Sequence, residues 1–228
     1  AQMFRYTNSF KEARFLRAYF YFNLVRAYGD VPYFTEMVTT DQVNSLTRTP
    51  AQEIFNAIIA ECDKLSTELP ADYTKLGLDG IAPAENGRVT CYAALALKAR
   101  AALYAASPLF NPENNKDLWR RAAEANKEVI ETCTANGFKL SKYSELWGPN
   151  NWSNNEMIFV RRYNGNISTL EEYNFPMGVP GGNSGNCPTQ NMVDAYEMKA
   201  TGKMWNETGS GYDASNPYVG RDPRFDMT

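Results

Sequence analysis

The sequence predicts a mainly α-helical protein, in which tetratricopeptide-like helical repeats form a scaffold and an irregular, loop-rich capping region follows. Two observations support this fold class. Four segments before residue 140 carry apolar residues at helical spacing, and glycine, asparagine and serine dominate much of the chain after it. The helical segments follow one another irregularly, without a strict 34-residue period, so we expect degenerate repeats. We therefore predict a helical scaffold at residues 1–139 and a loop-rich capping segment of the same domain at residues 140–228.

The first predicted helix spans residues 12–28, EARFLRAYFYFNLVRAY, and ends at Gly29-Asp30. Apolar residues occupy nearly all of its faces, which is typical of a helix that other elements cover on several sides. Its charged residues Arg14, Arg17 and Arg26 are expected to pair with carboxylates of neighbouring elements or to reach solvent. We interpret them as structural residues.

The second predicted helix begins at Thr49-Pro50-Ala51-Gln52, a pattern that fits a capping box with proline at the first helical position. Pro70 ends it. Its apolar residues recur at spacings of three and four, and they are Ile54, Phe55, Ile58, Ile59, Cys62, Leu65 and Leu69. This pattern predicts one buried face.

Two more helices follow. Residues 90–107 are rich in alanine, so neighbouring helices can approach that backbone closely. The next helix is expected to begin with Asp117 as N-cap and to end at Asn136-Gly137. Its predicted buried face consists of Leu118, Trp119, Ala122, Ala125, Val129, Ile130 and Cys133.

The second part of the chain has weaker signals. Residues 156–163, EMIFVRRY, predict a short strand, and residues 188–198 predict a short amphipathic helix. The surrounding segments are rich in glycine, asparagine and serine, which favour turns and loops.

The composition excludes several classes of function. The chain has no histidine, which removes Ser-His-Asp and Cys-His nucleophiles and every histidine-containing metal site. The four cysteines never approach a C-x-x-C spacing, and we expect neither a metal nor a cofactor. The formal charge is −3 and the basic residues are dispersed, which argues against nucleic acid as a partner. No apolar run is long enough to span a bilayer.

Four stretches resemble the SusD/RagB family of bacterial outer-membrane nutrient-binding lipoproteins. They are EARFLRAYFYFNLVRAYGDVPYF at residues 12–34, GRVTCYAALALKARAALYAASPLFNP at 87–112, PTQNMVDAYEMKATGK at 188–203 and RDPRF at 221–225. The first is the most specific, because generic helix composition rarely combines E-A-R-F-L-R-A with a terminal G-D-V-P.

This resemblance implies a SusD-like fold and a non-enzymatic protein that binds glycans for nutrient uptake. It also implies delivery of the oligosaccharide or polysaccharide to a TonB-dependent, SusC-like transporter, and a location at the cell surface on the bacterial outer membrane. Family members begin with a lipoprotein signal and continue well beyond the RDPRF element. We therefore expect a lipid anchor outside this sequence and a chain that is incomplete at both ends relative to the family.

Glycan binding requires aromatic faces for sugar rings and amide or carboxylate groups for hydroxyls, held on exposed loops. The sequence places such residues together where no helical or strand period demands burial. The predicted ligand-binding residues are Asn151, Trp152, Trp205, Asn206, Tyr212, Asp213 and Tyr218. The alternative is that these aromatic residues anchor loops to the core. Arg221, Asp222 and Arg224 are expected to form a structural charged turn.

Two other functions remain open at this point. A glycoside hydrolase would need two carboxylates flanking one bond, and the sequence singles out no pair. A helical-repeat adaptor would instead present an exposed groove to a protein partner.

Overall fold

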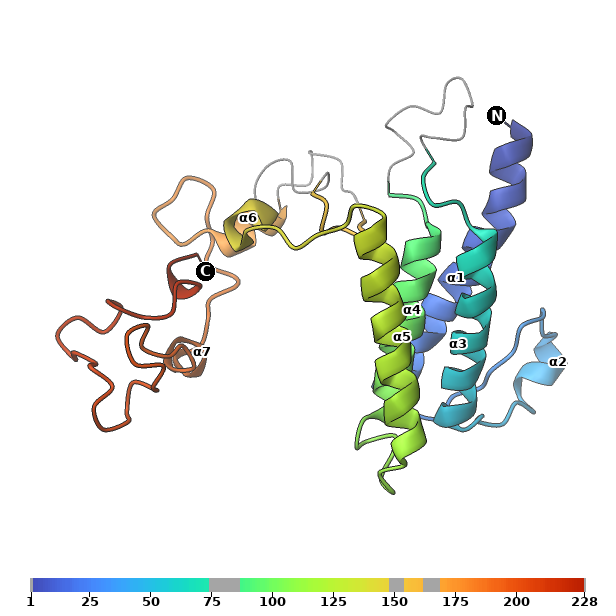
Figure 1. The fold of residues 1–228 in the computed structure, drawn as a ribbon, viewed down its shortest axis with the longest axis horizontal. Coiled ribbons are helices and arrows are strands. Elements are labelled where there is room, and N and C mark those ends of the chain that lie inside the picture. Colours follow the sequence, from blue (N-terminus) through green and yellow to red (C-terminus); the bar gives the residue numbers. More distant parts are fainter. Residues whose placement is uncertain (1, 74–86, 148–153, 162–168, 228) are drawn as a thin grey trace. The chain divides into compact units, whose positions relative to one another are not determined.

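The computed structural model describes residues 2–73, 87–147, 154–161 and 169–227 (Figure 1). The chain divides into two compact units, Ala1–Arg162 and Tyr163–Thr228, and each is described by itself. The first unit consists mainly of helices, and within the described residues the only β pairing consists of isolated bridges. The prediction of a mainly α-helical fold is therefore confirmed. The expected boundary after residue 139, between the helical scaffold and the loop-rich capping segment, stays a prediction.

Four long helices form the first unit (Figure 1). They are α1 (Gln2–Tyr28), α3 (Ala51–Glu68), α4 (Cys91–Ala106) and α5 (Lys116–Ala135). Helix α1 packs mainly on α3, α3 packs on α4, and α4 packs on α5. Shorter helices occupy the connections, namely α2 (Thr40–Val43) and the 3-10 helix η2 (Tyr143–Trp147). The order of packing follows the order of the chain, as expected for helical repeats.

The core of this unit lies where small residues of α4 meet large ones of α1 and α3. Ala94, Ala101 and Ala106 are completely buried, and so are Ile54 and Phe55 of α3. Alanine adds little bulk above the helix backbone, so α3 and α5 both approach α4 closely. The close approach predicted for residues 90–107 is confirmed.

The N-terminus of α3 differs from the sequence prediction. Pro50 is the N-cap residue, and no capping box forms, because its side chain accepts no hydrogen bond. The backbone of Thr49 instead pairs with that of Val31. The cap is supplied from elsewhere, since the Asp30 carboxylate accepts a hydrogen bond of 2.8 Å from the Ala51 amide.

Gln52 also has a different role from the one expected. Its side-chain amide donates to the carbonyls of Ala105 and Phe110, at 2.7 and 2.8 Å. It therefore ties the start of α3 to the end of α4 and the chain that follows it.

Helix α5 begins at Lys116, two residues earlier than predicted. Asn115 is the N-cap, and its side chain accepts from the amide of Asp117. The predicted end at Asn136-Gly137 is confirmed, because Gly137 adopts a φ of 88° directly after the C-cap. Part of the predicted buried face is wrong: Trp119 is 38% exposed and Ile130 is 66% exposed. Among the long helices α5 packs mainly on α4, which covers a narrower stripe of α5 than the sequence predicted.

Helix α1 is longer than predicted and is buried on one face rather than on several. Phe15, Phe22 and Val25 are completely or almost completely buried, whereas Phe20 is 59% exposed. The physical reason is that α3, with a small contribution from α4, is its helical neighbour in the described structure.

Residues 156–161, the described part of the predicted strand, form no strand. Ile158 and Phe159 instead pack on the surface between α1 and α4, where the Phe159 ring meets Phe15 edge-on at 5.5 Å. Apolar residues in this short segment are satisfied by that contact, and no partner strand is present in the part of the chain that the structure describes.

The second unit consists mostly of turns. Its regular elements are α6 (Thr169–Asn174), α7 (Gln190–Asp194) and the 3-10 helix η4 (Phe225–Met227). Helix α7 is shorter than the helix predicted at residues 188–198. Isolated bridges pair Met198 with both Lys203 and Arg221, and Met198 is buried. These bridges bring Lys203 and Arg221 to either side of the buried Met198.

Candidate functional site

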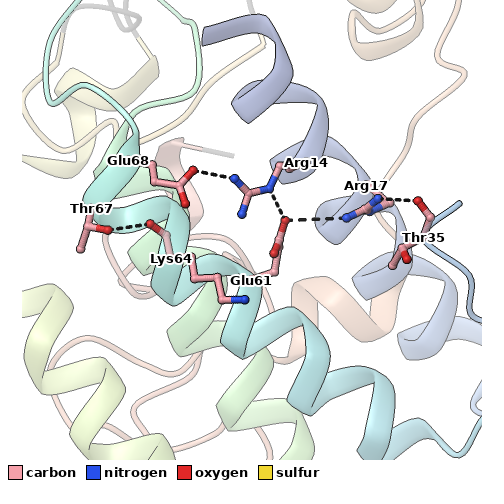
Figure 2. A network of polar contacts seen from close by, with 7 residues as sticks. All are labelled: Arg14, Arg17, Thr35, Glu61, Lys64, Thr67 and Glu68. Carbon is pink, nitrogen blue, oxygen red and sulfur yellow. Dashed lines mark hydrogen bonds and ion pairs between the residues drawn. The ribbon is translucent and has the colours of Figure 1, made fainter. Parts of the chain in front are cut away.

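Helices α1 and α3 are joined by a network of charged groups (Figure 2). The Arg14 guanidinium donates to Glu61 at 2.7 Å and to Glu68 at 2.5 Å. The hydrogen bond from Arg14 lowers the pKa of Glu61 and raises that of Arg14. Arg17 lies 3.7 Å from the same Glu61 carboxylate and donates to the carbonyl of Thr35. These contacts agree with a structural role for the two arginines.

A second group of ion pairs joins Arg88 to α1, and α4 to α3 and α5. Arg88 makes a two-pronged contact with Glu12 of α1, at 2.8 and 2.6 Å. Lys98 of α4 bridges Asp63 of α3 and Glu128 of α5, at 2.5 and 2.8 Å. Each of these charges has an oppositely charged partner, so they explain helix packing without a ligand.

The second unit is organised around one buried arginine. Arg221 is only 4% exposed, and its guanidinium donates to the carbonyls of Pro217 and Tyr196 at 3.0 and 2.9 Å. It also lies 5.1 Å above the centre of the Tyr212 ring. A guanidinium over an aromatic face is attracted by the ring's electrons. Arg221 therefore fixes the position of Tyr212 as well as the backbone on either side.

Tyr212 in turn contacts Trp205. Their rings meet edge to face, with 5.5 Å between centroids. Trp205 and Tyr212 are half-buried, and Asn206, directly after Trp205, is exposed. Ser210 lies between these two residues in the sequence and is buried. Its hydroxyl accepts a hydrogen bond from the Tyr212 amide and donates one to the Trp205 carbonyl. The two rings are therefore held by both packing and backbone contacts.

Among the predicted aromatic residues of the second unit, Tyr218 has the most exposed ring. It is 59% exposed and stacks on Phe225, with 6.0 Å between centroids and 15° between planes. Tyr196 meets the same Phe225 ring edge-on at 5.3 Å. One face of Tyr218 is thus supported by Phe225, and a ring that is more than half exposed remains available to a ligand.

Asp213 supplies a carboxylate in the same segment. It is exposed and accepts from the Ser215 amide at 2.9 Å and from the Asn216 side chain at 2.8 Å. The hydrogen bond from Asn216 is the largest cause of its lowered pKa. Each carboxylate oxygen can accept more than one hydrogen bond, so Asp213 keeps capacity for a sugar hydroxyl.

The structure places five of the predicted residues in one segment of the second unit, and contacts link three of them through a common support. The Trp205 ring contacts the Tyr212 ring, and the Arg221 guanidinium lies over the other ring of this pair, Tyr212. Arg221 also donates to the carbonyl of Tyr196, whose ring contacts Phe225. Phe225 in turn stacks on Tyr218. We call Trp205, Tyr212, Tyr218, Arg221 and Phe225 the aromatic cluster. Asn151 and Trp152 lie outside the described residues.

Arg221 and Phe225 were not predicted as parts of the site. Both belong to RDPRF, whose composition signalled a charged turn. The charged turn is present, because Arg224 makes a two-pronged contact with Asp222, which lowers the pKa of Asp222 to about 2. Tyr212 and Arg221 are separated in the sequence, so no local pattern predicted their contact.

The first unit contains a cleft beside α1, with a volume of about 600 Å³. Apolar and aromatic side chains of α1 and of residues 159–160 form much of its lining. The lining residues are Leu16, Tyr19, Phe20, Gly87, Arg88, Phe159, Val160 and Arg161. The described residues contain no cluster of acidic or cysteine side chains that could hold a metal ion. None of the described helices is both long and apolar enough to cross a bilayer.

Comparisons with known proteins agree on one family. The SusD-like family model described as "Starch-binding associating with outer membrane" matches residues 4–103. SusD-like protein P25 of Formosa agariphila is 25% identical over 94% of this chain. A solved SusD-like protein from Bacteroides fragilis is 28% identical over 94% of the chain, with a TM-score of 0.71. A SusD-like carbohydrate-binding protein from the same species is 29% identical over 97% of the chain, with a TM-score of 0.75.

The chain spans about 40% of the length of each of these three relatives. The match extends through both units, so the resemblance does not depend on the helical scaffold alone. The family model, the curated relative and the solved structures are all SusD-like, so the resemblance of this chain to the SusD/RagB family is confirmed.

Proposed function

We propose that this protein is a non-enzymatic glycan-binding protein of the cell surface, which captures oligosaccharides for nutrient uptake. The observation that carries the proposal is the aromatic cluster, in which an exposed Tyr218 ring and a half-buried Trp205–Tyr212 pair are held on one support. The carbohydrate binding named for the relative from Bacteroides fragilis supports the same ligand class.

The chemistry of the cluster suits a sugar. The C–H face of a pyranose ring packs on an aromatic ring, while its hydroxyls need donors and acceptors beside that ring. Asp213 and Asn206 are exposed in the same segment and provide an acceptor and an amide. A ring face that buries about 100 Å² contributes about 2.5 kcal/mol, and a millimolar complex needs about 4 kcal/mol. Binding therefore requires two aromatic contacts, or one with several hydrogen bonds.

The three carboxylates whose pKa is shifted do not have the property that a general acid of a glycosidase needs. A glycosidase needs a general acid whose pKa is raised so that it carries a proton at neutral pH. The pKa is lowered for Glu61, Asp213 and Asp222, by hydrogen bonds from Arg14, Asn216 and Arg224 respectively. These three carboxylates are ionised at neutral pH and suit ion pairing or hydroxyl binding.

Delivery of the captured glycan to a TonB-dependent, SusC-like transporter completes the proposal. Its support is the family, whose model carries the description "associating with outer membrane". The same description supports an association with the outer membrane, for which we propose a lipid anchor outside this sequence.

The first experiment measures thermal stability of the protein across a panel of soluble oligosaccharides. A ligand at 100 times its dissociation constant stabilises the folded state by about 2.7 kcal/mol. Chromatography of the same samples reports whether the sugar stays intact. A shift with intact sugar is expected; a shift accompanied by shorter products contradicts the non-enzymatic role.

Variants then locate the site. Tyr218→Ala is expected to weaken binding about 10- to 100-fold, since it removes one ring face. The matched control is Tyr28→Ala, because Tyr28 is also an exposed tyrosine, at 72%, but lies at the end of α1. Equal affinity of the Tyr218→Ala variant and the parent chain for a sugar that binds would exclude Tyr218 as a contact of that sugar.

A further inference from the structure

Two of the four cysteines lie at the same end of two neighbouring helices. All four cysteines are free thiols in the structure. Cys91 is the first residue of α4, and Cys133 lies in the last turn of α5. Cys133 is buried and Cys91 is half-buried. Helices α4 and α5 pack on each other and are joined by residues 107–115, so the start of α4 lies beside the end of α5.

Contacts between the two helices fix which residues face each other. Lys98 of α4 pairs with Glu128 of α5 at 2.8 Å, and Asn126 donates to the carbonyl that follows Lys98 in α4. Cys91 precedes Lys98 by seven residues, and Cys133 follows Asn126 by seven residues. Seven residues are close to two helical turns, so each cysteine lies on the face that makes these contacts. This register places the two thiols opposite each other.

Contacts at the ends of the two helices agree with this register. The ring of Tyr92, next to Cys91, meets the Phe138 ring at 4.9 Å between centroids. The Phe138 amide in turn donates to the Cys133 carbonyl at 3.0 Å. Burial is the largest cause of the raised pKa of Cys91, and the charge of a Cys133 thiolate raises it further. A charge acts in this way on a group only a few ångströms from it.

We propose that Cys91 and Cys133 form a disulfide when the protein meets an oxidant that itself carries a disulfide bond. The Cys91 thiolate attacks one sulfur of the oxidant and releases the other as a thiol. Cys133 then loses its proton and attacks the Cys91 sulfur of this mixed disulfide. The protein gives up two electrons and two protons, and the oxidant becomes two thiols. Glycan binding plays no part in this step, and the oxidising compartments through which exported proteins pass supply such oxidants.

Cys91 is the thiol that reacts first. It is more exposed than Cys133, and the backbone amides of Cys91 and Tyr92 at the start of α4 favour its thiolate. Burial nevertheless raises the pKa of both thiols, so only a small fraction of each is thiolate at neutral pH. Because the thiolate is the reactive form, the rate of oxidation should rise about tenfold per pH unit near neutral pH.

Oxidation by glutathione disulfide tests the proposal. The purified protein carries Cys187→Ser, which removes the exposed thiol. It is reduced, oxidised, alkylated in denaturant and digested with trypsin. The expected product is peptide 89–98 joined to peptide 128–139, lighter than the two free peptides by two hydrogen atoms. In a Cys133→Ala variant a glutathione adduct should accumulate on Cys91, whereas in a Cys91→Ala variant Cys133 should stay unmodified.

The bond should also stabilise the fold. It closes a loop of about 40 residues, so oxidation should raise the midpoint of thermal unfolding by about 5 °C or more, and a reductant should reverse the rise. The matched control is Cys91→Ala, in which oxidation should leave the midpoint unchanged. Recovery of both cysteines as alkylated thiols, or of a bond to Cys62, would overturn the proposal. A linked chain that unfolds no later than the reduced chain would also overturn it.

Discussion

The carboxylate of Asp30 accepts a 2.8 Å hydrogen bond from the amide of Ala51, so the turn that ends α1 caps the start of α3. The first amides of a helix have no partner within it, and a side-chain oxygen that satisfies one of them stabilises the helix. Here the oxygen comes from 21 residues earlier in the chain. The cap therefore joins two helices and orders the connection that contains α2.

Removal of this cap is expected to destabilise the first unit. Asp30→Ala should lower the free energy of unfolding by about 0.5–2 kcal/mol, as measured by urea denaturation. Asp30→Asn keeps an acceptor oxygen and should lose less. If both variants lose the same amount, the charge of Asp30 matters and the hydrogen bond to Ala51 does not.

The Arg14–Glu61 pair predicts how stability depends on pH. The pKa of Glu61 is lowered in the folded state, so its contribution is complete above the ordinary pKa of glutamate, about 4.3, and is lost as pH falls through the lower folded value. Glu61→Gln should cost about 1–3 kcal/mol at pH 7 and flatten the loss of stability below about pH 5. Denaturation at a series of pH values measures both effects.

The control for this pair is Glu131→Gln. Glu131 lies 3.7 Å from Lys127, and both side chains are about two-thirds exposed. Such a pair contributes about 0.5 kcal/mol or less. An equal cost for Glu61→Gln and Glu131→Gln would show that the network in Figure 2 is as weak as a surface pair.

Helix α4 predicts a contrast between two alanines. Ala101 is completely buried in the core, so Ala101→Leu should destabilise the protein by about 1–3 kcal/mol through overpacking. Ala96 instead lines a cavity of about 240 Å³ beside Phe15 and Phe159, so Ala96→Leu should be tolerated. Thermal denaturation compares the two. A smaller loss for Ala101→Leu than for Ala96→Leu would contradict the packing described for α4.

Arg221 is expected to hold the second unit together. Arg221→Ala leaves the carbonyls of Pro217 and Tyr196 without their donor and removes the cation over Tyr212. A cost of about 1–3 kcal/mol is expected for that unit. Hydrogen exchange should show faster exchange across residues 196–225. Arg224→Ala is the control, since Arg224 is 63% exposed, and unchanged exchange in both variants would rule out this role for Arg221.

Much of the helical scaffold could be predicted from the sequence, because its signals are local. The recurrence of Ile54, Ile58 and Leu65 at helical spacing, with Pro70 beyond, was enough to place α3. Helix α4 lies within the predicted range 90–107, with Thr90 as its N-cap, and Gly137 follows the C-cap of α5 as predicted. Such signals act within one or two helical turns, where the chain has little conformational freedom to lose.

The errors lie where a distant residue competes with a local one. Thr49 had the sequence of an N-cap, but Asp30 satisfies the start of α3. Residues 156–161 had the composition of a strand, but Phe159 finds its apolar contact on Phe15. In both places a tertiary contact replaced the structure that local propensity favoured.

The sequence by itself determined the helical periods, the C-terminal ends of the long helices, the absence of histidine chemistry and the resemblance to SusD-like proteins. Only the tertiary structure decided which aromatic residues share a support and which face of α1 stays exposed. Tyr212 meets Arg221, and Tyr218 meets Phe225, across loops whose closure has no periodic signal in the sequence. Burial depends on how many elements pack on a helix, and that number is a property of the folded chain rather than of any segment of it.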